Sequence, residues 1–142
     1  ILLLVSRQQQ NGENYTVTIP EEIEMAVSYF NENYNTKISV AQYAESLHIS
    51  TNWFIRNFKQ HMKMSPAQYL LSLRMVNAQS LLENTDYSVG EIAEIVGYDN
   101  QLYFSRVFKK EYGISPAQYR KRAENQSAAP MESDVGEITR ED

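Results

Sequence analysis

The chain has 142 residues, of which 42% are hydrophobic and 22% charged, and its formal net charge at pH 7 is −5. It contains no cysteine, which excludes a disulfide framework, a thiolate zinc site and a cysteine nucleophile. No apolar run reaches the roughly 18 to 20 residues that cross a membrane, so we expect no membrane association. The length suits one domain or two small ones.

The N-terminal stretch begins with the apolar sequence ILLLVSR and continues with polar residues. We interpret residues 1–18 as the remnant of an upstream domain or as a linker, with a local apolar plug as the alternative. Pro20, followed by Glu21 and Glu22, predicts the start of a helix, because acidic side chains are favourable at a helix N-terminus. This helix is expected to brace the unit that follows, through Ile23, Ala26, Val27 and Phe30.

Two blocks of the sequence occur twice. The pentapeptide SPAQY stands at residues 65–69 and again at 115–119, an offset of 50. Upstream of each copy, SVAQYAESL at 39–47 is similar to SVGEIAEIV at 88–96, an offset of 49. Five consecutive identities in register with a second similar block predict one supersecondary unit used twice, with one residue inserted or lost between the blocks.

Each copy is predicted to contain a short helix, a tight turn and a second helix. Ser39 and Ser88 are the expected N-caps of the short helices, each with Gln or Glu three residues later. His48 and Gly97 fall in the turn, where a left-handed backbone is adopted freely by glycine and tolerably by histidine. We assign His48 to this turn rather than to a metal or catalytic site, because no pattern joins it to His61, the other histidine.

Between the two copies, residues 65–85 predict one long helix. Ser65 is a suitable N-cap, Pro66 fits the first helical turn, and Gln68 can complete a capping box. A helix of about 20 residues is about 30 Å long, close to the ~34 Å of one turn of B-DNA. The apolar positions expected along it are Leu70, Leu73, Val76 or Asn77, Leu81 and Leu82.

The second helices are expected to bury one face and expose the other. Their buried stripes, at i, i+4 spacing, consist of Phe54 and Phe58 in the first copy and Phe104 and Phe108 in the second. Aligning these stripes places Arg56 opposite Arg106 and Trp53 opposite Tyr103, all off the buried face. Such a polar, aromatic and Arg-bearing face suits a helix in the major groove of DNA. The alternative is a solvated face with incidental arginines, which matching arginines in both copies disfavour.

Charge is distributed unevenly along the chain. Residues 39–123 carry a net charge of +3, whereas residues 1–38 carry −3 and residues 124–142 carry −5. The positive charges collect after Ser50 and after Gln101, within the second helices. Residues 124–142 lack aromatic side chains and any apolar period, so we interpret them as an acidic disordered tail.

The repeated blocks closely resemble the DNA-binding domain of AraC-type (AraC/XylS) transcription regulators over about residues 39–122, most specifically in FSRVFKKEYGISPAQYR. The resemblance implies an all-α fold, with two helix-turn-helix subdomains joined by a long linker helix. Each subdomain would insert its second helix into a major groove. The base-contacting positions that the resemblance implies are Asn52, Ile55, Arg56, Gln101, Leu102, Ser105 and Arg106. Basic residues after these positions are expected to contact phosphates: Lys59, Lys109 and Lys110.

The resemblance divides the chain into a first subdomain with linker helix at 19–84 and a second subdomain at 85–123. It implies a cytoplasmic, sequence-specific transcription regulator that binds a double-stranded DNA operator and needs no cofactor or metal. RNA polymerase is an expected partner, and a small-molecule effector is expected to act only through a missing upstream domain. The isolated domain is expected to be a monomer, although the full-length protein can dimerise.

Two other classes of protein remain as alternatives. A helical protein-interaction module would explain the repeat but not the matching arginines. An enzyme is disfavoured, because the sequence shows no nucleophile with a base, no metal-ligand cluster and no phosphate-binding glycine loop.

The first copy also departs from the second at a helix end. Lys63 stands where the second copy has Gly113, so this exit is expected to be strained or differently built. Ile55 and Leu102 cannot hydrogen-bond a base edge and are limited to thymine methyl groups. Arg74 matches a family position, with a structural ion pair with an acidic residue as the alternative to a phosphate contact.

Overall fold

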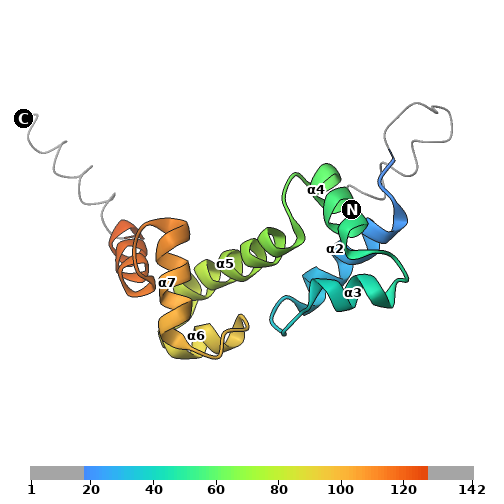
Figure 1. The fold of residues 1–142 in the computed structure, drawn as a ribbon. Helices are drawn as coiled ribbons and strands as arrows, with labels where there is room; N and C mark the ends of the chain where they lie inside the picture. The colour runs from blue at the N-terminus through green and yellow to red at the C-terminus, as the bar shows by residue number, and fades with distance from the viewer. Residues whose placement is uncertain (1–17, 128–142) are drawn as a thin grey trace, which may run out of the picture. The chain divides into compact units, whose positions relative to one another are not determined.

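The computed structural model describes residues 18–127, and every regular element within them is a helix (Figure 1). The helices are α2 at Glu21–Asn33, α3 at Val40–Ser46, α4 at Thr51–Met62, α5 at Pro66–Asn84, α6 at Val89–Ile95 and α7 at Gln101–Tyr112. A further helix begins at residue 116 and is described as far as residue 127. The prediction of an all-α fold with two helix-turn-helix units and a long intervening helix is confirmed.

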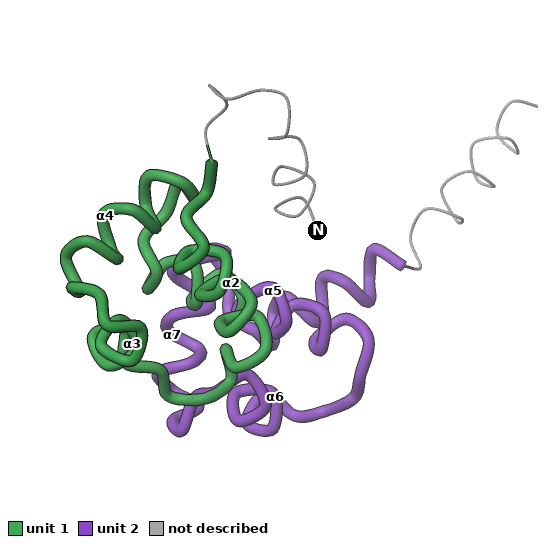
Figure 2. The backbone as a smooth tube through the Cα atoms, turned by 90° about the vertical axis from the view of Figure 1, so that its right-hand side faces the viewer, with its two compact units in different colours: residues 1–73 green, residues 74–142 purple. Residues whose placement is uncertain are grey.

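The chain divides into two compact units, unit 1 up to Leu73 and unit 2 from Arg74 onward (Figure 2). The division falls within α5, whereas the family resemblance implies a boundary after residue 84, with the whole of this helix in the first subdomain. Each unit therefore includes one part of α5.

The core of unit 1 is built from aromatic rings. Phe30 of α2 lies 6.4 Å from Phe54 and 5.8 Å from Phe58, measured between ring centroids, and Tyr69 of α5 lies 5.6 Å from Phe58. The rings meet in tilted and edge-on arrangements, which aromatic pairs prefer. Ala44 is fully buried, so α3 can approach these rings closely. The expected face of α2 is confirmed: Ile23, Ala26 and Phe30 are fully buried, and Val27 packs against the core.

Unit 2 repeats this arrangement, with its part of α5 in the place of α2. The buried side chains of that part stand 52 positions after those of α2: Met75, Ala78 and Leu82 correspond to Ile23, Ala26 and Phe30. Phe104 and Phe108 of α7 are fully buried, and Phe108 lies 5.6 Å from Tyr119. The repeat therefore includes a bracing helix in each copy, in addition to the two helices that the sequence similarity indicated.

The long helix α5 begins with the predicted capping box. The backbone N–H of Ser65 donates to Oε1 of Gln68 at 3.0 Å, and the N–H of Gln68 donates to Oγ of Ser65 at 3.2 Å. Leu70 is buried in the core of unit 1. Of the two alternatives farther along, Val76 is 58% exposed and Asn77 is half-buried. The two parts of α5 pack in different cores, so a single apolar stripe does not describe this helix.

The turns between the short and second helices are left-handed, as predicted. The φ angle is 61° at His48 and 103° at Gly97. In both copies the next residue donates its N–H to the carbonyl five residues earlier, at 3.1 Å in the first and 2.8 Å in the second. Asp99 is the additional residue of the second copy, because it separates this turn from the N-cap Asn100, whereas the first copy proceeds directly to the N-cap Ser50.

The second helices also end in left-handed residues. Lys63 has a φ angle of 67° and Gly113 one of 85°, and each donates its N–H to the carbonyl four residues earlier. Lys63 thus adopts the exit that glycine favours, and the strained alternative is the correct one. A left-handed conformation costs a residue with a Cβ roughly 1–2 kcal/mol.

The helix at the C-terminal side of unit 2 extends through residues 124–127, so these residues do not belong to the predicted disordered tail. The remainder of that tail and residues 1–17 of the proposed upstream remnant lie outside the described residues. Within residues 18–127, no helix is long and apolar enough to cross a membrane.

Candidate nucleic-acid interface

Helix α4 is fixed by its N-cap and by two buried rings. Oγ of Ser50 accepts the N–H of Trp53 at 3.0 Å, and Phe54 and Phe58 are fully buried. Because a helix turns about 100° per residue, burying these two rings directs the residues two positions before and after them outward. The predicted DNA-facing residues of this helix are all exposed: Asn52, Ile55, Arg56 and Lys59.

Helix α7 is held in the same way. Oδ1 of Asn100 accepts the N–H of Tyr103 at 3.0 Å, and Phe104 and Phe108 are fully buried. Ser105 is half-buried, at the edge of the outward face. The other predicted DNA-facing residues of this helix are exposed: Gln101, Leu102, Arg106, Lys109 and Lys110. Leu102 has 65% of its surface exposed, which is high for an apolar side chain.

The expectation that Trp53 and Tyr103 both point outward is wrong for Trp53. Trp53 is half-buried and packs against the core of unit 1, because its large indole reaches the edge of that core from the first turn of α4. Tyr103 is 57% exposed, and its ring lies 5.8 Å from that of Tyr98. An aromatic side chain therefore lies beside the outward face of α7 but not beside that of α4.

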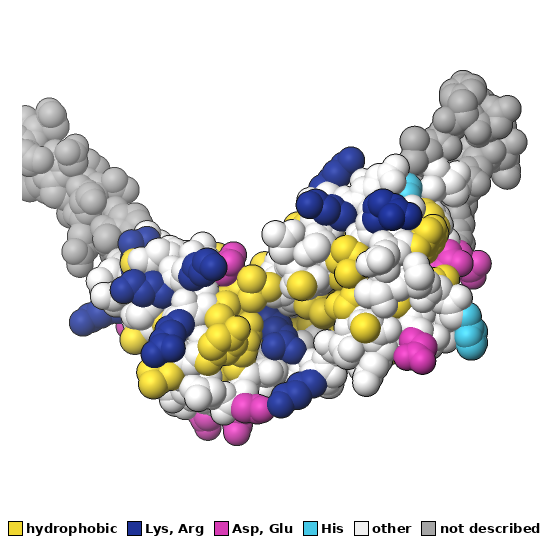
Figure 3. All heavy atoms as spheres, viewed as in Figure 1, with side chains coloured by type: hydrophobic (Ala, Val, Ile, Leu, Met, Phe, Trp, Pro, Cys, Tyr) yellow, Lys and Arg dark blue, Asp and Glu magenta, His cyan; other side chains and the backbone are white. Residues whose placement is uncertain are grey.

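The outward faces carry positive charge. Figure 3 shows Lys and Arg side chains gathered over α4, while the acidic side chains visible in unit 1 lie over other elements. Helix α4 contains no Asp or Glu, and α7 contains only Glu111. Arg56 and Arg106, and likewise Lys59 and Lys109, hold matching positions 50 residues apart. Each unit thus presents an Arg opposite its buried rings and an exposed Lys one turn further along the same helix.

Arg74 has a structural role within unit 2. Its guanidinium carbon lies 4.9 Å from the centroid of the Tyr98 ring, which is cation–π distance. Burial raises the pKa of Tyr98, and the hydrogen bond and charge of Arg74 oppose that rise. Tyr98 also lies 5.5 Å from Phe104, so Arg74 covers the ring against which the start of α7 packs.

Two residues without a predicted functional role, Tyr119 and Arg120, join the last described helix to the end of α5. Arg120 donates from Nε to the carbonyl of Leu82 at 3.1 Å and from Nη2 to the carbonyl of Thr85 at 3.0 Å. Tyr119 donates its hydroxyl to the carboxylate of Glu83, and this bond, with smaller effects of burial, raises the pKa of Tyr119 to about 12. These contacts hold the bracing helix of unit 2 against the helix that follows α7.

The sequence contains one weak signal of this junction. Arg120 follows the second SPAQY at the position where Leu70 follows the first. A Leu and an Arg at matching positions indicate that the two side chains have different neighbours. This difference does not identify the carbonyl groups that Arg120 contacts.

Gln101, at the first position of α7, lies over the start of α6. A Cβ atom built on Gly90 would stand 2.8 Å from Oε1 of Gln101. That distance is shorter than a van der Waals contact, so the absence of a side chain at residue 90 leaves room for the Gln101 amide in its present position.

Two helix-turn-helix units, each with an outward second helix that is basic, define a bipartite DNA-binding domain of the transcription-regulator class. A family model described as "Helix-turn-helix domain" matches residues 43–122. The chain belongs to the AraC-type helix-turn-helix family, as the sequence resemblance predicted.

Known proteins agree with this assignment. The raffinose operon transcriptional regulatory protein RafR of Pediococcus pentosaceus is 37% identical over 111 residues, which cover 78% of this chain and 40% of that protein. The C-terminal domain of AraT, a response regulator from Geobacillus stearothermophilus, matches with a TM-score of 0.71 and 36% identity over 75% of this chain and 88% of that one. The DNA-binding domain of AdpA, a global transcriptional factor solved in complex with a target DNA, gives a TM-score of 0.70 and 29% identity over 75% and 96%. The chain therefore spans less than half the length of RafR.

Proposed function

We propose that this domain reads its operator by inserting α4 and α7 into the major groove, one helix from each unit. The observation that carries the proposal is the matched pair Arg56 and Arg106, both exposed and both opposite fully buried phenylalanine pairs. A protein-interaction module does not require an Arg at the same position of both copies. Arg donates in a bidentate manner to guanine, so the pair suits two separate base contacts.

The other outward residues of the two helices suit complementary roles. Asn52 and Gln101 bear amides of the kind that bond adenine, while Ile55 and Leu102 offer apolar contact to the thymine methyl group. Ser105 has a hydroxyl that bonds either a donor or an acceptor on a base edge. Specificity is expected to be strongest at the base pairs that face arginine and weakest at those that face the apolar pair.

The exposed lysines are proposed to bind the DNA backbone. Lys59, Lys109 and Lys110 lie in the second half of their helices, where a flexible ammonium group reaches phosphate without reading sequence. Contacts of this kind fix the register of the protein on the duplex and make its affinity dependent on salt.

The parent regulator is proposed to act in the cytoplasm, with RNA polymerase as its partner. Its relatives differ in their described roles, since RafR is named for the raffinose operon and AraT is described as a response regulator. We propose that a small-molecule effector acts on this protein only through a domain outside this chain. The domain alone is proposed to bind DNA as a monomer, whereas the full-length regulator is proposed to dimerise.

Selection of bound duplexes from a random pool by the full chain tests the proposal. We expect enrichment of a bipartite sequence with a guanine in each half, and loss of preference at one base pair each in Arg56→Ala and Arg106→Ala. A pool that stays random after repeated selection, with binding that unlabelled random duplex competes equally well, would contradict sequence reading and favour a protein-interaction module.

A further inference from the structure

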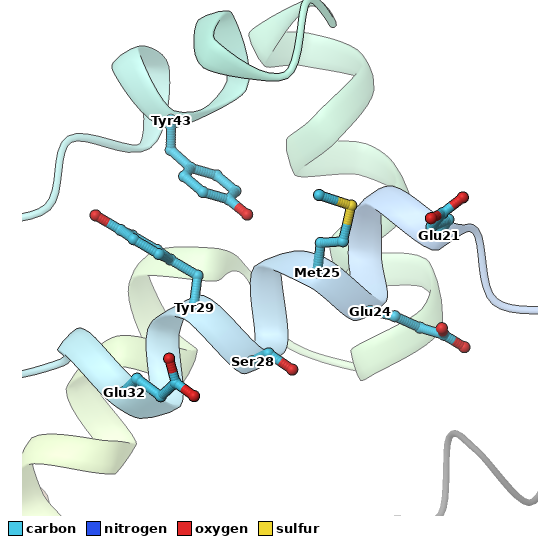
Figure 4. A pocket seen from close by; sticks show the side chains of 7 residues that line it. All are labelled: Glu21, Glu24, Met25, Ser28, Tyr29, Glu32 and Tyr43. Atoms are coloured by element: carbon cyan, nitrogen blue, oxygen red, sulfur yellow. The ribbon is translucent and has the colours of Figure 1, made fainter.

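Unit 1 has a second surface, on the helices that precede α4. A hollow of about 460 Å3 lies between α2 and α3 (Figure 4). We call it the α2–α3 hollow, and its lining residues are Glu21, Glu24, Met25, Ser28, Tyr29, Glu32 and Tyr43. Figure 4 shows Tyr29 and Tyr43 extending toward each other from the two helices, with Met25 beside them and the glutamates along α2. Each of these residues lies outside α4.

The hollow exposes apolar surface that a small helical unit normally buries. Met25 is 45% exposed and Tyr29 is 40% exposed. The Tyr29 and Tyr43 rings are stacked, with centroids 4.8 Å apart and an angle of 19° between their planes. Because the two rings cover each other, the aromatic surface open to a partner is the exposed part of Tyr29 together with the ring edges. Exposed Tyr side chains are typical of the centre of an interface, where Tyr contributes large contact area at low entropic cost.

The repeat within the chain shows that the fold does not require this surface. The positions of unit 2 that match Tyr29 and Tyr43 are Leu81 and Ile92, and Ile92 is fully buried. The positions that match the lining acids Glu24 and Glu32 are occupied by Val76 and Asn84. Unit 2 builds the same helices without the stacked tyrosines or the carboxylates, so these features of unit 1 are additions to the helix-turn-helix fold.

The charge around the hollow indicates the chemistry of its occupant. Its lining includes three glutamates and no Lys or Arg, so it repels the phosphates that α4 attracts. A guanidinium group stacks on a tyrosine ring and donates two parallel hydrogen bonds to a carboxylate, which an ammonium group cannot do. Arginine therefore matches both components of the hollow, the stacked rings and the acidic edge.

The surface continues on the other side of the tyrosine pair. A second hollow of about 210 Å3 shares Tyr29 and Tyr43 and is otherwise lined by Lys37, Ile38, Ser39, Gln42 and Ser46. An occupant that crosses the tyrosine pair would thus contact α2, α3 and the loop between them. This length of surface suits a polypeptide segment better than a single small cation.

We propose that the α2–α3 hollow docks an Arg-bearing segment of a partner protein, with a guanidinium against the exposed surface of Tyr29 and the positive charge of the segment offset by the glutamates along α2. The site is separate from the DNA-reading face of α4, so unit 1 can hold DNA and this segment through different elements. It is an interaction surface in addition to the operator contact.

An NMR titration of the 15N-labelled full chain with a capped peptide of alternating Arg and Gly tests the proposal. Matched peptides replace every Arg by Lys or by Gln. We expect saturable shifts on α2 and α3, affinity at least about fivefold higher for the Arg peptide than for the Lys peptide, and no saturation with the Gln peptide. Shifts confined to the acidic residues after 123, or equal affinity for Arg and Lys peptides, would overturn it.

Two sets of variants distinguish docking from general charge attraction. Tyr29→Leu with Tyr43→Ile introduces the residues that unit 2 has at these positions, and Glu21→Gln with Glu32→Gln removes charge but keeps shape. Each set should lower the affinity for the Arg peptide by about tenfold.

The control is Glu45→Gln, an exposed acid of α3 outside the hollow, which should change affinity little. If the tyrosine variant does not fold, the glutamate variant alone decides.

Unchanged affinity of the glutamate variant for the Arg peptide would overturn the proposal. Shifts at α2 and α3 that depend on protein concentration in the absence of peptide would also overturn it, because they would assign this surface to a second copy of the chain. Operator affinity is measured separately, and we expect neither set to reduce it, so failure here is distinguishable from failure of DNA reading.

Discussion

The side-chain amide of Asn31 donates a hydrogen bond to the hydroxyl of Tyr69 at 2.9 Å, across 38 residues of chain. The corresponding pair of unit 2 is Glu83 and Tyr119, 52 and 50 residues later, in which the tyrosine hydroxyl is the donor. The same contact between a bracing helix and the Tyr that ends the SPAQY motif is thus made in both units, with the direction of the bond reversed. Only the unit 2 version involves a charged group.

The reversal makes unit 2 sensitive to alkaline pH through Tyr119. Its hydrogen bond to Glu83 raises its pKa from the ordinary 10 to about 12. A raised folded-state pKa stabilises the fold below pH 10, and that contribution is lost as the pH rises through 12. We expect the unfolding free energies of wild type and Tyr119→Phe to converge between pH 10 and pH 12. Denaturant titrations across that range measure this, and a constant difference would show that the bond does not depend on the tyrosine proton.

The two kinds of basic residue on α4 and α7 should respond differently to substitution. Arg56→Ala and Arg106→Ala should each cost about 1–3 kcal/mol on the selected operator and relax preference at one base pair. Lys110→Ala should lower the affinity for all duplexes by a similar factor. It should also reduce the slope of log affinity against log salt concentration by about 1. Affinity measured on selected and random duplexes at several salt concentrations separates these outcomes. Equal losses on both duplexes for the arginine variants would reassign those side chains to phosphate.

Gly90 leaves open the space that the Gln101 amide occupies, so Gly90→Ala should change specificity without loss of stability. The added Cβ meets only the far end of a flexible side chain, at 2.8 Å, which can turn away. Replacing a helical Gly by Ala is itself favourable by about 0.5–1 kcal/mol. We expect a melting temperature that is unchanged or higher, and a changed base preference at one pair in duplex selection. Ala41→Gly is the matched control, because it makes the reverse exchange at the equivalent position of unit 1, away from Gln101. Unchanged preference in Gly90→Ala would show that Gln101 does not read a base.

The two helix exits give a reciprocal test of backbone strain. Lys63→Gly should raise the unfolding free energy, by at most about 1 kcal/mol, because it relieves a left-handed residue that has a Cβ. Gly113→Ala should lower the unfolding free energy by about 1–2 kcal/mol for the opposite reason, although nothing lies within 4 Å of the added atom. Chemical denaturation measures both changes. If Gly113→Ala has no effect, strain at these exits is relieved by local rearrangement.

The features that the sequence predicted correctly depend on local physics. Phenylalanines at i, i+4, a capping serine and a glycine in a turn each restrict the backbone within a few residues, and Phe104, Ser88 and Gly97 lie as expected. The bracing role of α5 in unit 2 was not predicted, because Met75 and Leu82 share only an apolar character with their counterparts in α2, Ile23 and Phe30.

The contacts of Arg120 and the half-buried position of Trp53 depend on which segments meet in space. Arg120 donates hydrogen bonds to carbonyl groups more than 30 residues earlier in the chain. Every residue has a backbone carbonyl, so the pattern of side chains does not indicate which of them Arg120 contacts. The exposure of Arg56 and Arg106 followed from the buried stripes, because on a helix the position of one face determines the other, whereas the stripe of α4 did not indicate that the Trp53 indole turns toward the core.

The last prediction concerns the helix that belongs to both units. Helix α5 is one helix from Pro66 to Asn84, with Leu70 buried in unit 1 and Met75 buried in unit 2. No Gly or Pro interrupts it after its first residue, so it contains no flexible tether. We therefore expect the two units to bind only half-boxes separated by one DNA turn, about 10 base pairs.

Two operator variants test this spacing. Inserting about 5 base pairs between the half-boxes turns one of them to the opposite side of the duplex, and bipartite binding should be lost. Inserting about 10 base pairs restores the face but adds about 34 Å, which a flexible linker would partly bridge and a continuous helix would not. Footprints of the full chain should therefore cover a single half-box on both variants. Protection of both half-boxes on the full-turn variant, at nearly the original affinity, would mean that α5 unwinds on DNA and that the two units read their half-boxes independently.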